Sequence, residues 1–247
     1  MRFGSSILFY VLKDYLNIQT YGQAQVIIYS GNNTPTVIDL NDLKSTTALS
    51  SVSEGHRYIL QALALLFELF PPNLDPSQGL TLEIHSQIPM KVGLGSSAAL
   101  AVALVKAYCQ WLNHHWDDQT LWQLSTQIEH LAHGQSSGLD PACALNVNPI
   151  EFHQGQITPL NSAPVPMTLI NTGQSLSTTK ACVNQTKTHF EQNPSLITQF
   201  QQVSTELKQG LLSRDLVQIG QAITKNQQLL QTIGVVPEPV AAMIERL

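Results

Sequence analysis

The stretch KVGLGSSAAL, residues 91–100, constrains this chain more than any other, because it joins a glycine-rich turn to a long apolar segment. Residues 98–112 are almost all apolar, which predicts a helix that is buried over most of its surface. Gly93 and Gly95 permit backbone conformations closed to other residues and let a ligand approach the backbone closely. The first amides of a helix lack intrahelical partners and carry the positive end of the helix dipole. The junction is therefore suited to a phosphate group.

The residue types of this loop leave more than one interpretation open. Ser96 and Ser97 add hydroxyls that can bond a phosphate or ligate a metal, but the same loop can also be an ordinary cap of a core helix. A P-loop is excluded, because a lysine should precede the hydroxyl residue and here Gly95 is followed directly by Ser96. The G-x-G-x-x-A spacing fits a dinucleotide fingerprint, yet Pro89 separates the preceding strand from the loop, which disfavours that interpretation.

Composition narrows the class of protein. The chain has 247 residues, of which 43% are hydrophobic and 12% charged, so it can bury a sizeable core. A net charge of −5 argues against a nucleic-acid partner. Three widely separated cysteines fit a reducing cytoplasm, and the apolar run over 7–12 is too short for a membrane span. We therefore expect a cytoplasmic protein that binds neither nucleic acid nor membrane; a homodimer is compatible with the sequence.

Hydrophobic periodicity predicts an α+β fold with a mixed sheet and helices in an N-terminal domain and a helix-rich C-terminal domain. The composition shift over 159–166 places the boundary between domains 1–160 and 161–247. The expected strands are 24–30, 35–40, 80–85 and 165–171, with a small hairpin within 135–160. The expected helices are 53–70, 98–112, 117–133, 178–190, 194–211, 213–233 and a last piece after Pro237.

A second segment, EHLAHGQSSGLDPA over 129–142, offers two carboxylates. Phosphoryl transfer needs little covalent help beyond a metal on the phosphates and a carboxylate at the acceptor hydroxyl. Glu129 near the end of a helix and Asp140 in a turn could supply one group for each task. Each also has an ordinary explanation, because Glu129 could be a solvated helix residue and Asp140 a turn residue before a proline.

The segment IPMKVGLGSSAALAVALVKA resembles the second motif of the GHMP kinases, small-molecule kinases for galactose, homoserine, mevalonate and phosphomevalonate. Residues 89–99 match its pattern P-x3-G-L-G-S-S-A-A position by position. The resemblance implies the two-domain GHMP kinase fold, with an ATP-binding domain in 1–160. It also implies that Ser97 ligates Mg²⁺ and that the following residues bind the ATP phosphates: Gly93, Leu94, Gly95, Ser96, Ser97 and Ala98.

Residues 129–140 resemble the mevalonate kinase form of another family segment, and MTLINTGQSLSTTKACV over 167–183 agrees with it. This resemblance implies that Glu129 is a second Mg²⁺ ligand and Asp140 the catalytic aspartate near the acceptor hydroxyl. It also implies that Gly138 and Thr179 lie near the substrate. From the residue type alone, Thr179 could equally be a helix N-cap.

The implied activity is the transfer of a phosphoryl group from ATP to a small alcohol, foremost mevalonate to 5-phosphomevalonate in isoprenoid precursor synthesis. Two alternatives stay open: phosphomevalonate kinase or another GHMP small-molecule kinase, and a non-catalytic nucleotide-binding remnant. The family's lysine motif P-G-K-x-x-L-x-G-E-H and its final G-x-G-G-G segment have no counterpart in these 247 residues. Since the resemblance spans roughly 20–247 without these two motifs, the sequence leaves open whether the turnover of this polypeptide is retained, weak or lost.

Overall fold

A computed structural model gives the structure of residues 14–31, 34–88, 92–162, 165–168, 170–173 and 179–246. The chain separates into two compact units. One takes in the described residues of Val11–Met90 and Leu94–Leu145, and the other those of Lys91–Gly93 and Asn146–Leu247. The domain boundary expected between 160 and 161 stays a prediction. The mixture of a sheet with many helices confirms the expected α+β class.

The first unit contains a four-stranded sheet in the order β1-β4-β2-β3. Strand β4 is antiparallel to β1 and parallel to β2, and β2 is antiparallel to β3. The β2–β3 hairpin and β4 confirm three expected strands, whereas β1 was not predicted. The bounds of the strands are β1 Asp14–Tyr21, β2 Gln25–Ser30, β3 Thr36–Asp39 and β4 Gly79–Ser86.

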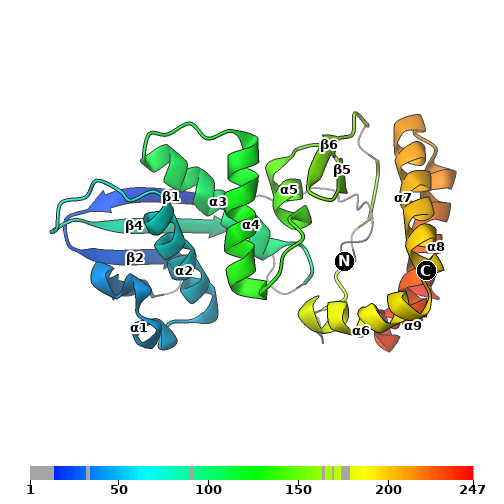
Figure 1. Ribbon diagram of the computed structural model, residues 1–247, viewed down its shortest axis with the longest axis horizontal. Helices are drawn as coiled ribbons and strands as arrows, with labels where there is room; N and C mark the ends of the chain where they lie inside the picture. Colours follow the sequence, from blue (N-terminus) through cyan, green and yellow to red (C-terminus); the bar gives the residue numbers. More distant parts are fainter. Residues whose placement is uncertain are drawn as a thin grey trace. The chain divides into compact units, whose positions relative to one another are not determined.

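Alternation of side chains along the strands builds the core of this unit. Ile18, Leu82 and Ile28 stand opposite one another on β1, β4 and β2, and all three are buried. Successive side chains of a strand point to opposite faces, so the buried residues two positions away extend the same apolar face. In Figure 1 the helices α2, α3 and α4 lie in front of this sheet. Their apolar stripes complete the core, which includes Leu63 and Ile128.

The helices of the first unit begin and end at residues whose chemistry fits those positions. The carboxylate of Asp117 accepts a hydrogen bond from the Thr120 amide at 2.8 Å, and Gly134 ends the same helix with φ +74°. Both boundaries confirm the sequence prediction. The bounds of the helices are η1 Leu40–Lys44, α1 Thr46–Ser50, α2 Glu54–Leu69, α3 Ser96–Trp111, α4 Asp118–His133 and α5 Leu139–Leu145.

The second unit is rich in helices, as expected. A hairpin joins β5 (Ile150–His153) to β6 (Gln156–Pro159), and α7 packs against α8. The strand predicted over 165–171 is wrong: its described residues, 165–168 and 170–171, belong to no strand. The helix bounds are α6 Thr179–Gln192, α7 Ser195–Ser213, α8 Leu216–Thr232 and α9 Glu238–Ile244. None of the helices in the described part of the chain has the length and hydropathy that a bilayer span requires.

Candidate active site

The structure brings two predicted metal ligands together. Ser97, in the first turn of α3, places its Oγ 3.4 Å from Oε2 of Glu129 in the last turn but one of α4. Helices α3 and α4 pack side by side, which is why residues 32 positions apart meet. Glu129 is only 3% exposed, so it is not the solvated helix residue that one sequence interpretation allowed. Ser125, also buried, lies one helical turn before Glu129 on α4.

The oxygens of this Ser97–Glu129 pair suit a small divalent cation. Their separation of 3.4 Å exceeds that of an ordinary O–H···O hydrogen bond. Two oxygens at adjacent positions around octahedral Mg²⁺, each roughly 2.1 Å from the ion, are about 3 Å apart. Mg²⁺ usually takes one or two protein oxygens and completes its shell with water and substrate phosphate. The described residues contain no group of three or more histidine, cysteine, aspartate or glutamate side chains placed to hold a metal ion.

Tyr58 of α2 completes the surroundings of the pair, and no sequence motif had pointed to it. Its hydroxyl donates a hydrogen bond of 2.9 Å to Oε1 of Glu129 and lies 3.4 Å from the carbonyl oxygen of Ser97. Burial raises the pKa of Tyr58, and the charge of Glu129 and the hydrogen bond to it raise this pKa further. The hydroxyl therefore stays protonated and remains a donor across the pH range of ordinary assays.

The glycine loop leads directly into the helix that carries Ser97. Gly93 and Gly95 have φ angles of +79° and +67°, in the left-handed region that favours glycine. Gly95 occupies the N-cap of α3, and because it has no side chain, the cap residue itself cannot bond the first amides. Ser96 is partly exposed, whereas Ala98 is buried against the core. The junction therefore presents backbone amides and hydroxyls next to the Ser97–Glu129 pair.

Asp140 lies in the first turn of α5 and is exposed. The helix α5 packs against both α3 and α4, the two elements that carry the Ser97–Glu129 pair. Burial, together with the smaller effect of the nearby charge of Asp140, raises the pKa of the Cys143 thiol to about 12. The carboxyl group of Asp140 is therefore accessible at the surface of the first unit.

The turn before Asp140 is held by Trp122 of α4. The indole Nε1 donates a hydrogen bond of 2.8 Å to the carbonyl oxygen of Gly138, whose φ is +81°. A Cβ atom at Gly138 would lie 2.8 Å from a ring carbon of Trp122, so only glycine fits there without a shift. The hydroxyls of Ser136 and Ser137 accept hydrogen bonds from the amides two residues ahead, at 3.1 and 3.2 Å. These contacts fix the backbone that leads to Asp140.

Thr179, the remaining predicted site residue, is the first residue of α6 in the second unit. The helix begins where the sequence pattern had placed it. The side chain of Thr179 and residues 174–178 lie outside the described part of the chain. Its assignment near the substrate stays a prediction.

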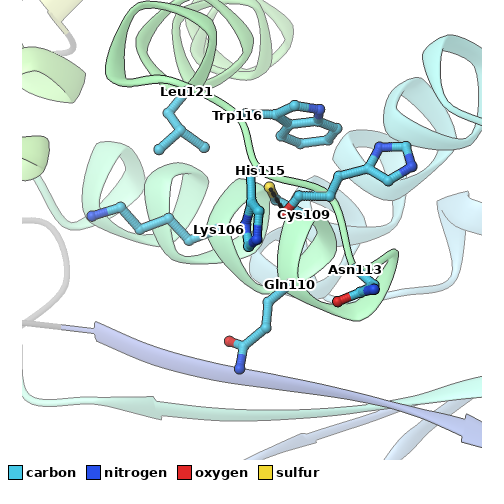
Figure 2. Close-up of a pocket in the computed structure, with 8 residues that line it drawn as sticks. Lys106, Cys109, Gln110, Asn113, His115, Trp116 and Leu121 are labelled. Carbon is cyan, nitrogen blue, oxygen red and sulfur yellow. Dashed lines mark hydrogen bonds between the residues drawn. The ribbon is translucent and has the colours of Figure 1, made fainter.

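A pocket of about 270 Å³ lies at the other end of α3, and Figure 2 shows it. Lys106 and Gln110 extend from α3, His115 and Trp116 from the connection to α4, and Leu121 from α4 itself. Thirteen residues of helix, about 20 Å, separate Gln110 from Ser97. The pocket is therefore separate from the Ser97–Glu129 pair.

Comparison with known proteins agrees with these features. Residues 57–146 match the family described as GHMP kinases N terminal domain. The mevalonate kinase of Pyrococcus horikoshii is 28% identical over a match that covers 93% of this chain and 72% of that protein. The crystal structure of Methanococcus jannaschii mevalonate kinase has a TM-score of 0.73 at 18% identity, over 93% of this chain and 72% of that one. Streptococcus pneumoniae phosphomevalonate kinase, in complex with phosphomevalonate and AMPPNP, has a TM-score of 0.64 at 18% identity, over 89% of this chain and 71% of that one.

These matches identify the chain as a small-molecule kinase of the GHMP type, with a GHMP kinase N-terminal domain that contains the Ser97–Glu129 pair. Among members of that class, the chain is similar to mevalonate kinases in both sequence and fold. The family resemblance drawn from the glycine loop and from residues 129–140 is thereby confirmed. The roles of individual site residues stay predictions.

Proposed function

We propose that the protein transfers the γ-phosphoryl group of ATP to the hydroxyl group of mevalonate and yields 5-phosphomevalonate and ADP. The observation that carries this proposal is the contact between half-buried Ser97 and buried Glu129 at the start of a helix entered by a glycine loop. The similarity to mevalonate kinases supports mevalonate as the acceptor. Isoprenoid precursor synthesis is the corresponding metabolic setting.

In this proposal the glycine loop binds the phosphates of ATP. Amides at the N-terminus of α3 and the hydroxyl of Ser96 face the phosphate oxygens, with Gly93, Leu94, Gly95 and Ala98 shaping the loop. Ser97 Oγ and Glu129 Oε2 would hold Mg²⁺. The ion, when bound, neutralises negative charge on the phosphates of the nucleotide.

Asp140 acts at the acceptor. Its carboxylate orients the acceptor hydroxyl and accepts the proton as that oxygen bonds to the γ-phosphorus. The bond between the γ-phosphorus and its bridging oxygen breaks, and ADP leaves with the bonding electrons. Gly138, two residues before Asp140, lies at the acceptor in this proposal, and the place of Thr179 near the substrate stays what the family resemblance implies. Rigid backbone before Asp140, held by the Trp122 hydrogen bond, supports this role because phosphoryl transfer depends on positioning.

The test is ADP release by the purified chain with Mg·ATP, measured with mevalonate, with phosphomevalonate and with neither. We expect ADP release that depends on mevalonate. Asp140→Ala should lower it by roughly 10²- to 10⁴-fold, as expected for a lost general base, and leave ATP binding intact. A folded sample that binds ATP but releases no ADP with mevalonate would overturn the proposal, as would unchanged turnover in Asp140→Ala. Faster ADP release with phosphomevalonate than with mevalonate would make phosphomevalonate the acceptor and leave the proposed roles of the site residues unchanged.

A further inference from the structure

We propose that Tyr58 is a positioning residue for the metal site: its hydroxyl fixes the Glu129 carboxylate so that Oε2 is directed toward Ser97 and the divalent cation. The inference rests on the proposed function, because it concerns the cation of a bound nucleotide. It adds a residue from α2, which lies outside the segments whose sequence predicted the site.

The contacts of Glu129 with Tyr58 and with Ser97 fall on different oxygens of its carboxylate. Tyr58 donates to Oε1 at 2.9 Å, and the Ser97 hydroxyl lies 3.4 Å from Oε2. The last torsion of a glutamate side chain is broad, so backbone and packing alone fix the carboxylate plane poorly. A strong donor on one oxygen selects one orientation of that plane. The other oxygen is then turned toward the start of α3.

Tyr58 is also placed against the second ligand of the pair. Its hydroxyl oxygen lies 3.4 Å from the backbone carbonyl oxygen of Ser97. One side chain from α2 therefore contacts the predicted ligands on α3 and α4, and the three helices pack against one another. Donors that bond a metal ligand from outside the coordination shell orient that ligand, and their loss commonly lowers metal affinity by about 10- to 100-fold.

A purely structural role would also give Tyr58 this hydrogen bond, because a buried carboxylate needs a partner. The two roles differ in what Tyr58→Phe changes. A structural role predicts lower stability and unchanged cation affinity of the folded protein. A positioning role predicts weaker cation binding even where the protein is fully folded.

Tyr108→Phe is a matched control for this substitution. Tyr108 is a buried tyrosine of the same unit, whereas Tyr58 is half-buried, and the Tyr108 hydroxyl donates a hydrogen bond of 2.6 Å to the carbonyl oxygen of Phe70. It lies on α3, eleven residues beyond Ser97 and therefore about 16 Å away along the helix. Both substitutions remove one buried hydroxyl and keep the ring.

The experiment titrates Mn²⁺ into the full chain in the presence of a non-hydrolysable ATP analogue and follows bound Mn²⁺ by electron paramagnetic resonance. We expect Tyr58→Phe to weaken Mn²⁺ binding by roughly 10- to 100-fold, and Tyr108→Phe to stay within about twofold of the unsubstituted protein. Thermal unfolding of each variant shows that the titrated sample is folded.

The outcomes separate this inference from the proposed function. If the unsubstituted chain binds Mn²⁺ with the analogue and Tyr58→Phe binds it equally well or more tightly, the positioning role is wrong and the proposed function stands. If the unsubstituted chain binds no Mn²⁺ with the analogue, both are wrong. A second measurement uses Glu129→Gln, in which Tyr58→Phe should weaken Mn²⁺ binding less than twofold further. A full additional loss in that background would show that Tyr58 acts independently of Glu129.

Discussion

Gly138→Ala tests how the turn before Asp140 is held. The new Cβ would lie 2.8 Å from a ring carbon of Trp122 and 3.0 Å from its Nε1, closer than packed atoms normally approach. The backbone φ of +81° adds the strain of a left-handed conformation. Gly134→Ala is the matched control, because Gly134 has φ +74° and, among the described residues, nothing within 4 Å of an added Cβ.

The magnitudes follow from these two geometries. Both substitutions incur the left-handed penalty of roughly 1–2 kcal/mol. Gly138→Ala alone incurs a further overpacking penalty of about 1–3 kcal/mol against Trp122. At roughly 3 °C per kcal/mol, we expect the Tm of Gly138→Ala to fall about 3–9 °C below that of Gly134→Ala.

Differential scanning calorimetry of the two variants and the unsubstituted protein measures this difference. Because the indole also bonds the Gly138 carbonyl oxygen, relief of the clash should move the turn and the adjoining Asp140. We therefore expect ADP release to drop more in Gly138→Ala than in Gly134→Ala at a temperature where both are folded. Equal Tm values for the two variants would refute the reasoning that Trp122 confines this turn.

Three further perturbations follow from individual contacts. Gly95→Ala should weaken the binding of Mg·ATP by about tenfold, because the N-cap φ of +67° costs an alanine roughly 1–2 kcal/mol. Isothermal titration calorimetry measures this affinity, and an unchanged affinity would argue against a phosphate site. The pKa of Cys143, raised from 9.0 to about 12, means that folding keeps the thiol neutral, so its contribution to stability is complete below pH 9 and is lost as the pH rises toward 12. Cys143→Ala should therefore flatten the fall in Tm over that pH range, and an equally steep fall in the variant would count against this assignment. Lys208→Met removes a 2.7 Å ion pair with Glu151 that joins α7 to β5. Urea denaturation should show that the free energy of unfolding falls by about 1 kcal/mol or less. A fall of several kcal/mol would mean that loss of the ion pair also disrupts other contacts.

The elements that could be predicted from the sequence are those whose signals are local. The apolar stripe of α4, its cap at Asp117 and its stop at Gly134 lie within one stretch of chain, and the structure has all three. The glycine loop and the helix after it are equally local, and their family resemblance is confirmed by comparison. Here local chemistry and global fold agree, which is the condition under which sequence patterns are informative.

The two errors in strand prediction have a common physical cause, which is that the pairing partners of a strand are distant in the sequence. Strand β1 has a mostly polar sequence and contributes Leu16 and Ile18 to the core; its partner β4 begins 58 residues after β1 ends. The predicted strand over 165–171 has strand-like residue types, yet its described residues form no ladder, and Met167 is 52% exposed. Helix α5 was taken for a turn because of Pro141, although proline is compatible with the first turn of a helix.

The same reasoning applies to the residues of the candidate site. Ser97 and Glu129 belong to motifs and could be named from the sequence, but their contact depends on how α3 packs against α4. Tyr58 had no such signal. A buried tyrosine hydroxyl requires a partner, but the sequence does not reveal that this partner lies 71 positions away. A positioning residue such as Tyr58 is therefore found from the structure, whereas predicted metal ligands such as Ser97 and Glu129 can be found from sequence motifs.

Helix α4 links the two halves of the candidate site. Trp122, which holds the Gly138 turn, and Glu129, which faces Ser97, are seven residues apart, so they lie on nearly the same side of the helix two turns apart. The rotation of α4 is fixed by buried side chains between them, among them Leu124 and Ile128. A change in that packing would turn both functional side chains together. The Ser97–Glu129 pair and the turn before Asp140 are thus both positioned by α4. Core substitutions in α4 should therefore affect cation binding and phosphoryl transfer at once.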